Sequence, residues 1–243
     1  MGVRYSISDN ENIYFNYSIS SRKPNPSELF SEGLHHSSAR IEVGDLSFTS
    51  EVGNNVSLNY SFSNVKSALT FSSFYNYVND FIYIIPVRTT TTIAGVFPVW
   101  EYMQADANLY GFDVKYDKQY FDNFFIGHQF SLVKGHERSN DKPLINMPPA
   151  NLKNSISYNF TDFNNLNISL ESEYVFEQNE YPNTNFEIYI PTTETYAMLD
   201  TSTPPKAYHL LNLSSSMRFN SKNGGKYKIN LRVENLFNNL YKD

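Results

Sequence analysis

The sequence predicts an all-β protein that crosses a membrane as an antiparallel up-and-down β-barrel. Apolar and polar residues alternate over stretches of about ten residues, as lipid-facing and lumen-facing positions do in barrel strands. Short and long links between these stretches also alternate along the chain. Aromatic residues make up 16% of the 243 residues, with 19 Tyr and 19 Phe, and Tyr is enriched at membrane interfaces. The alternative is a soluble, aromatic-rich β-protein.

Five strands are expected in the first half of the chain. Each is a run of alternating residues bounded by turn-forming residues, and the first begins almost at the N-terminus. The pattern is clear where Val56, Leu58 and Tyr60 are separated by Ser and Asn. The five ranges are Val3 to Ser8, Asn12 to Ser20, Ser50 to Phe62, Ser67 to Tyr83 and Ala107 to Tyr116.

Five more strands are expected in the second half. In the last of them, every apolar residue from Tyr227 to Val233 is followed by a charged or amide residue, so one face is apolar and the other is polar. The five ranges are Phe124 to Gly135, Lys153 to Phe160, Leu166 to Phe176, Tyr208 to Phe219 and Tyr227 to Leu236.

The links between the expected strands are of two kinds. Tight periplasmic turns and large extracellular loops give a barrel this short-long order. The short links are Asp9 to Glu11, Ser63 to Lys66, Asp117 to Asn123, Thr161 to Asn165 and Asn220 to Lys226. The long links are Ser21 to Thr49, Ile84 to Asp106, His136 to Leu152 and Glu177 to Ala207. We therefore expect one structural unit over residues 1–243, with about ten strands of a larger barrel.

Composition excludes several other classes. No apolar run reaches the ~20 residues of a transmembrane helix. The chain has no cysteine, which rules out disulfides and thiolate metal sites. Its net charge of −6 argues against a nucleic-acid partner. The N-terminus has no signal-peptide core, so we expect the sequence to be part of a longer chain.

A motif follows the second expected strand. The segment from Ser21 to Asp45 reads SRKPNPSELFSEGLHHSSARIEVGD. It resembles the signature region of TonB-dependent outer-membrane receptors, in which an Arg-x-Pro-x-x-x-Glu-Leu segment and a later Glu-x-Gly-Asp pair bracket a loop between barrel strands. The matching residues are Arg22, Pro24, Glu28, Leu29, Glu42, Gly44 and Asp45.

A second motif lies near the C-terminus, where Asn235, Leu236, Phe237 and Asn238 are followed by Tyr241. It is similar to the Asn-Leu-Phe-Asn motif of the same family's penultimate strand. The resemblance implies a barrel of about 22 strands whose N-terminal plug domain is absent from this sequence. It also implies location in the bacterial outer membrane and energised uptake of a scarce nutrient through the TonB complex, without catalysis.

The resemblance is closest to receptors for zinc and iron complexes. His35, His36 and Glu32 offer imidazole and carboxylate donors that suit zinc at an extracellular loop. The alternative is two exposed loop histidines without a ligand. No resident cofactor is expected, because zinc, a siderophore or haem would be cargo.

Two loop clusters suit a larger, flat ligand. Trp100 and Tyr102 lie in one long link, and Tyr189 and Tyr196 lie in another. Aromatic side chains can stack on a hydrophobic chelate or a porphyrin, although such clusters equally pack loops together.

Two other functions remain open at this point. A passive porin or adhesin would lack both motifs, and a barrel enzyme would need a paired acid-base or nucleophile arrangement that the sequence does not show.

Overall fold

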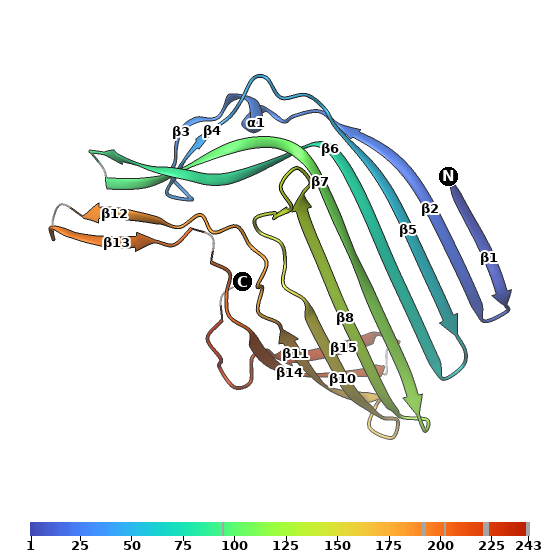
Figure 1. Ribbon diagram of the computed structural model, residues 1–243. Coiled ribbons are helices and arrows are strands. Elements are labelled where there is room, and N and C mark those ends of the chain that lie inside the picture. The colour runs from blue at the N-terminus through green and yellow to red at the C-terminus, as the bar shows by residue number, and fades with distance from the viewer. Residues whose placement is uncertain (94, 191–192, 202, 221–223, 242–243) are drawn as a thin grey trace.

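The computed structural model describes residues 1–93, 95–190, 193–201, 203–220 and 224–241. These residues form an almost entirely β structure (Figure 1). The main path of the sheet runs in the order β1 (Gly2–Ser8), β2 (Glu11–Arg22), β5 (Glu51–Ser63), β6 (Ser67–Thr92), β7 (Gly95–Tyr120), β8 (Phe124–Glu137), β10 (Asn151–Phe160), β11 (Leu166–Val175), β14 (Tyr208–Asn220) and β15 (Lys226–Val233). Each of the ten expected strands corresponds to one of these elements.

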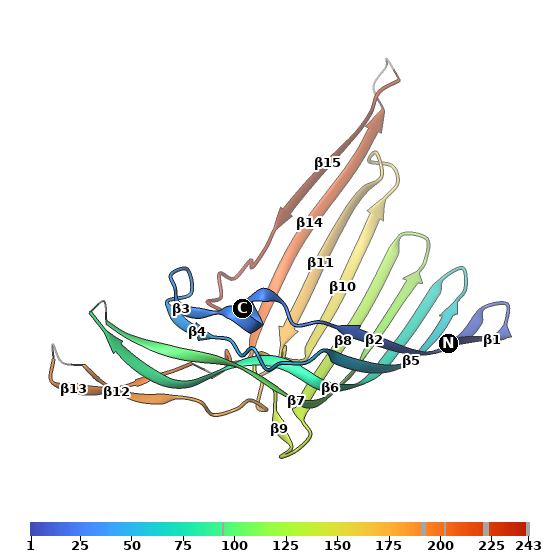
Figure 2. The same cartoon turned by 90° about the horizontal axis from the view of Figure 1, so that it is seen from above.

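Every neighbouring pair on this path is antiparallel. Viewed from above, the strands follow one another around a curved, open sheet (Figure 2). Among the described residues, β1 pairs only with β2 and β15 pairs only with β14. The fold is therefore an up-and-down antiparallel sheet with the curvature of a barrel wall, and its two edges are not joined to each other.

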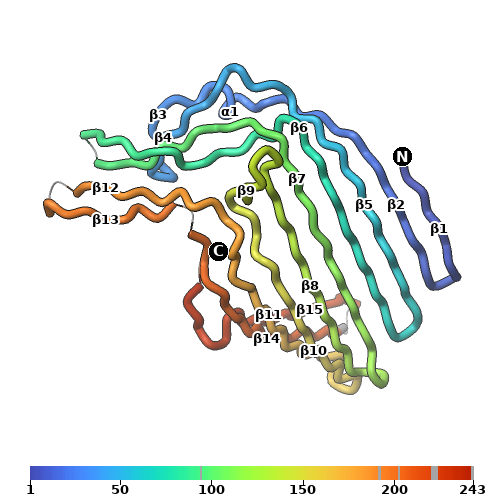
Figure 3. The backbone as a smooth tube through the Cα atoms, in the orientation of Figure 1, coloured from blue at the N-terminus to red at the C-terminus, as the bar shows by residue number. Residues whose placement is uncertain are grey.

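The connections are sorted between the two ends of the sheet. Tight turns join β1 to β2, β5 to β6 and β7 to β8 at one end (Figure 1). At the other end the chain makes long insertions, as the backbone trace shows (Figure 3). The insertions contain α1 (Pro26–Phe30), β3 (Glu32–His35), β4 (Arg40–Val43), β9 (Lys142–Pro143), β12 (Phe186–Ile190) and β13 (Thr195–Leu199). The predicted short-long alternation is confirmed. Residues 221–223 of the last expected turn lie outside the described part.

The expectation that Ile84 to Asp106 forms a loop is wrong. β6 and β7 continue through this range as a long hairpin that stays paired up to Thr92 and Gly95. Pro86, which cannot donate to a ladder, is fully buried at a break in the register between Pro86 and Arg88. A second irregularity lies between Val78 and Phe81. The β-branched and aromatic residues of the hairpin favour strand structure, and the two bulges accommodate the unpaired residues within the ladder.

Buried apolar side chains are few, and they gather where the insertions meet the sheet. Besides Pro86, those in the described part of the chain are Val78, Ile82, Val99, Trp100, Ala107, Leu144, Ile145, Val175 and Leu210. Elsewhere, large apolar side chains of the strands are exposed, such as Ile7, Ile19 and Leu231. An apolar surface of this extent marks contact with a membrane or with another protein surface. No helix in the described part of the chain is long and apolar enough to cross a bilayer.

Candidate functional site

The strand register divides the sheet into two chemically different faces. One row across five strands carries Asp117, Gly127, Ser155, Glu171 and Asn212. The adjacent row carries Ile126, Ile156, Leu170, Leu213 and Val233. Because neighbouring residues of a strand point to opposite sides, these rows belong to opposite faces, which we call the polar face and the apolar face.

The first motif builds a compact ion-pair cluster at the insertion end of β2. Arg22 donates from Nε and one terminal nitrogen to the two oxygens of Glu51, at 2.6 and 2.8 Å. Its other terminal nitrogen donates to both oxygens of Glu28, at 2.9 and 3.0 Å. Glu28 and Glu51 are only 6% and 8% exposed. The planar guanidinium suits this double contact because its five N–H donors have a fixed fork geometry.

Local sequence chemistry explains how Glu28 reaches this position. Asn25 caps α1 by accepting from the Glu28 backbone N–H at 3.0 Å, and Glu28 accepts from the Asn25 backbone N–H at 2.8 Å. Pro26 begins the helix, where its missing N–H costs nothing. This reciprocal capping box fixes the single helical turn and so aims Glu28 at Arg22.

Gly44 and Asp45 close the same insertion onto α1. The Gly44 N–H donates to the Ser31 carbonyl at 2.7 Å, and the Asp45 N–H donates to the Glu28 carbonyl at 2.9 Å. A Cβ on Gly44 would lie 2.7 Å from the Glu28 carbonyl oxygen and 2.8 Å from the Leu29 carbonyl carbon. Only glycine fits so close to rigid backbone. The motif residues of this segment are therefore brought together in one structural unit.

The insertion also covers one of the predicted aromatic clusters. β4 pairs in parallel with β7, placing Glu42 opposite Trp100. The Arg40 guanidinium lies 4.6 Å from the centre of the Trp100 ring and also binds Glu42. Trp100 is 8% exposed, so this geometry supports the packing alternative for Trp100. Tyr102 lies on the same half-buried part of β7, and its contact with a ligand stays a prediction.

The second aromatic pair is arranged differently. Tyr189 of β12 and Tyr196 of β13 are directly paired across the hairpin, with ring centres 5.3 Å apart. Both side chains are exposed, Tyr196 to 69%. This hairpin lies beside the outer part of β6 and β7 (Figures 1 and 2). Its aromatic surface is exposed, and its contact with a ligand stays a prediction.

The predicted zinc residues lie on and after β3. The His35 ring Nδ1 is 3.1 Å from the hydroxyl oxygens of both Ser37 and Ser38. Glu32 and His35 line a shallow hollow of about 280 Å³ together with Glu42. Within the described ranges, no group of three or more His, Asp or Glu side chains is placed to hold a metal ion. The zinc site stays a prediction.

The second motif forms a turn after β15, which ends at Val233 rather than at Leu236. Asn235 has φ of 52° and bonds Asn239 twice, donating to its carbonyl and accepting from its N–H, each at 2.9 Å. The Asn235 N–H donates to the buried side chain of Asn212 at 2.9 Å. Asn239 then donates to the His209 carbonyl at 2.7 Å. This motif therefore anchors the chain to β14, at a place separate from the Arg22 cluster.

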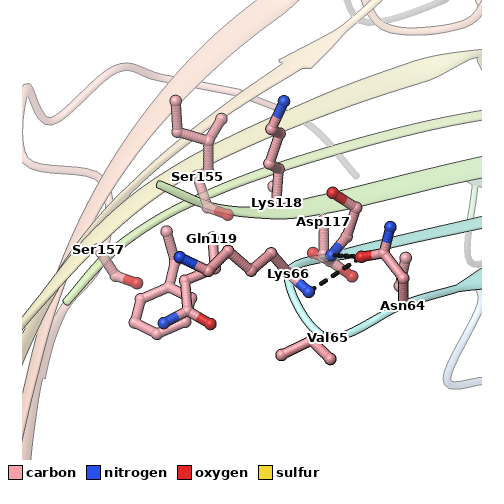
Figure 4. Close-up of a pocket in the computed structure, with 13 residues that line it drawn as sticks. Asn64, Val65, Lys66, Asp117, Lys118, Gln119, Ser155 and Ser157 are labelled. Atoms are coloured by element: carbon pink, nitrogen blue, oxygen red, sulfur yellow. Dashed lines mark hydrogen bonds between the residues drawn. The ribbon is translucent and has the colours of Figure 1, made fainter. Parts of the chain in front are cut away.

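A hollow of about 440 Å³ opens beside the tight-turn end of the sheet (Figure 4). Gly127, Asp117 and Ser155 of the polar face line it, with the turn from Asn64 to Lys66 at its edge. The Asn64 side chain accepts from the backbone N–H groups of Lys66 and Ser67 at 2.9 and 2.7 Å, which fixes that turn. Val65, Phe125 and Ile126 add apolar side chains to the lining, and Lys66 and Lys118 add charged ones.

Three residues of these sites were not predicted. Glu51 and Asn212 are buried acceptors whose partners come from distant sequence positions, so no local signal reveals them. Asn25 had a signal, because Asn-Pro-x-Glu is a helix-capping pattern.

Comparison of the sequence with models of protein families shows which family the chain belongs to. The model described as "TonB dependent receptor-like, beta-barrel" matches residues 1–236. The chain belongs to this family. The resemblance based on the Arg22 and Asn235 motifs is confirmed. No curated protein matches the sequence.

Several solved structures share the fold of this chain. The copper transporter OprC matches with a TM-score of 0.77 and 16% identity, over 100% of this chain and 34% of that one. The FrpB iron transporter from Neisseria meningitidis matches with 0.62 and 15%, over 99% and 34%. The ferric enterobactin receptor PfeA from Pseudomonas aeruginosa matches with 0.65 and 13%, over 97% and 34%. The chain thus spans about a third of the length of these matched structures.

Proposed function

We propose that residues 1–243 form part of the barrel domain of an outer-membrane receptor that takes up a scarce metal ion or iron complex. The observation that carries this proposal is the division of the sheet into an apolar and a polar face, in a chain of the TonB-dependent receptor family. In a bilayer every backbone polar group must be paired, and a closed barrel satisfies this while its polar face lines the lumen.

The insertions at one end of the sheet suit ligand capture. They present polar and aromatic side chains beyond the strands, whereas the opposite end has tight turns. Loops of this length inside a compact barrel are expected to be functional. We assign the insertion end to the cell exterior and the tight-turn end to the periplasm. Passage of the ligand would then draw energy from the TonB complex, through the plug of the full receptor.

The proposed cargo is zinc, a ferric siderophore or haem. Similar structures are named as a copper transporter, an iron transporter and a ferric enterobactin receptor, which supports a metal or a metal complex as the class. His35, His36 and Glu32 are the proposed zinc donors. Tyr102, Tyr189 and Tyr196 are the proposed contacts for a larger chelate, and Trp100 lies buried beneath Arg40 on the same strand as Tyr102. The chain acts as a receptor and not as an enzyme in this proposal.

Calorimetric titration of the full-length receptor tests the cargo. Zinc, haem and a ferric chelate are titrated in parallel into wild type and into the variant with both His35→Ala and His36→Ala. If the two imidazoles bind zinc, the variant loses about tenfold or more in zinc affinity, because two of the metal's ligands are gone. His128→Ala is the matched control, since its Nδ1 contacts Asn154 on the apolar face, away from β3.

Three results are informative. Zinc affinity that is equal in wild type and in the double variant removes His35 and His36 from the site. Binding of the ferric chelate or haem alone would move the site to the aromatic insertions. Binding of none of the three, together with no TonB-dependent growth on any of them, would contradict the proposed cargo class.

A further inference from the structure

A second, larger hollow lies among three segments of two insertions at the proposed outer end of the sheet. Its volume is about 480 Å³, within the range of small-molecule sites. The three segments are those before β10, between β11 and β12, and between β13 and β14. The lining residues are Asn146, Met147, Pro148, Pro149, Gln178, Glu180, Tyr181, Asp200, Thr201, Thr203, Pro204, Pro205 and Tyr208.

The walls of this hollow are held in place by short-range contacts. Two Pro-Pro pairs come from different insertions, and each proline has a fixed φ. The Gln178 amide donates to the Met147 and Pro148 carbonyls at 3.3 and 3.4 Å, which joins two of the segments. Thr201 donates through its hydroxyl to the Thr184 carbonyl at 2.7 Å. A site built in advance in this way loses little conformational entropy when a ligand binds.

The position of the hollow relates it to the polar face. Tyr208 begins β14 opposite Val175, which is itself opposite Asn151. This row has the same parity as the row of Ser155, Glu171 and Asn212. Tyr208 therefore belongs to the face that we assign to the lumen, so that a group bound beside it lies next to the path inward.

The lining has a clear charge preference. Glu180 and Asp200 contribute two carboxylates, and among the described residues the lining contains no Lys, Arg or His. The cations nearest to Glu180 are Lys134 and His136 of β8, which bind it from outside the lining. Tyr181 and Tyr208 add aromatic rings, whose faces attract positive charge. Because Lys134 compensates part of the charge of Glu180, Asp200 and the ring faces carry most of the preference: an anionic ligand would meet no lining cation, whereas these groups attract a cation.

We propose that this hollow is a capture subsite for an organic cation, such as a positively charged chelate or an amine carried on an apolar ring. The apolar ring would contact the prolines and Met147, and the positive charge would lie near Asp200, Glu180 and the tyrosine rings. The proposal rests on the proposed function in one respect, the assignment of the insertion end to the exterior. It predicts discrimination against anionic chelates at this position.

Two small probes that share a ring but differ in charge test the subsite. Benzyltrimethylammonium and benzenesulfonate are titrated by calorimetry into the full-length receptor in nanodiscs of neutral lipid. We expect the cation to bind and the sulfonate not to bind. The variant with Glu180→Gln and Asp200→Asn should bind the cation about tenfold more weakly, since two carboxylates are lost. Tyr181→Ala should also weaken it.

Glu177→Gln is the matched control, because Glu177 is an exposed carboxylate of the same segment outside the lining. It should leave cation binding unchanged. Equal or tighter binding of the sulfonate by wild type overturns the proposal, as does absence of binding by both probes or full affinity in the double carboxylate variant. Wild type alone decides between the two charges, so a variant that fails to fold does not remove the test.

The titration is separate from transport. If cells that carry the wild-type receptor show no TonB-dependent uptake, the proposed function is contradicted. The charge preference of the hollow, measured by calorimetry, is unaffected by that result. A receptor that transports a metal complex but binds neither probe would retain the proposed function and lose the subsite.

Discussion

Arg22 is the residue that connects the first motif to the neighbouring strands. Its guanidinium is shared between Glu28 of α1 and Glu51 of β5, and Glu51 also accepts from the Ile82 backbone N–H at 2.7 Å. One cation thus connects the insertion with β2, β5 and the irregular part of β6. The motif residues around Arg22 hold the architecture of the insertion.

Replacing Arg22 with Ala should destabilise the barrel. Two nearly buried carboxylates would lose their cation, which we expect to cost about 2 kcal/mol, below the range for fully buried pairs because the Arg22 side chain is 45% exposed. Urea unfolding of the full-length receptor measures this. Arg232→Ala is the control, since Arg232 and Glu234 are an exposed pair that should contribute less than about 1 kcal/mol. Equal losses in both variants would refute the role of Arg22.

At the scale of single residues, the sequence motifs identified which residues belong to the insertion cluster better than they predicted which contacts those residues make. Arg22, Glu28 and Gly44 were found through the motif, and the structure brings them together. Their partner Glu51 was missed, because a contact between residues 29 positions apart has no local pattern. Trp100 was predicted as an aromatic loop residue, but the pairing of β4 with β7 covers it. Sequence periodicity does not predict such a parallel contact within an antiparallel sheet.

Strands were the elements that the sequence predicted best. Period-two alternation depends only on which face each side chain occupies, and it located all ten strands of the main path. It failed in the β6–β7 hairpin beyond Tyr83, where the register break between Pro86 and Arg88 interrupts the alternation. Bulges change the parity of a strand, so a pattern based on strict alternation reads the segment as a loop.

The turn after β15 supports a prediction at the same scale. Asn235 has a left-handed φ of 52° and two side-chain bonds to Asn239. Asn235→Gly should keep the backbone conformation and lose the bonds, whereas Asn235→Ala should lose both, for a cost of about 1–2 kcal/mol. Thermal unfolding should rank wild type above Gly and Gly above Ala. If Ala is as stable as Gly, the φ of Asn235 has no energetic role.

The contact between the segment after β11 and strand β8 should weaken in acid. The hydrogen bond from Lys134 lowers the pKa of Glu180 below its ordinary value of 4.5. A carboxylate with a lowered pKa contributes stability above that ordinary value, and this contribution is lost as the pH falls through the lowered pKa. The contact that holds the segment against β8 is therefore complete at neutral pH and is lost in strong acid.

A spin label at Asn179→Cys reads this contact, since residue 179 is exposed and the chain has no cysteine of its own. The label should become more mobile when the pH is lowered from 7 to about 2, in strong acid. In a Glu180→Gln background the label should be mobile at both values. An acid response that persists in that background would come from another group.

On the scale of the whole molecule, the account depends on the two faces of the sheet. Alternation predicted both the strands and their faces, and the register places most apolar residues of one strand opposite apolar residues of the next, as Ile156 lies opposite Ile126. Sequence alone did not give the open curve of the sheet or the packing of the insertions, because both depend on contacts between distant segments (Figure 2). The exposed apolar face is the property that a bilayer would satisfy.

Three consecutive serines of β14 allow the most direct test of this claim. Ser214 and Ser216 lie opposite Arg232 and Asn230 on the polar face, whereas Ser215 lies opposite Leu231 on the apolar face. Each is replaced in turn by Cys in the full-length receptor and spin-labelled in outer membranes, and its accessibility to oxygen and to a water-soluble nickel complex is measured. We predict oxygen accessibility at 215 and nickel accessibility at 214 and 216. Uniform accessibility at all three positions, or the reverse order, would contradict a barrel wall with its apolar face in lipid.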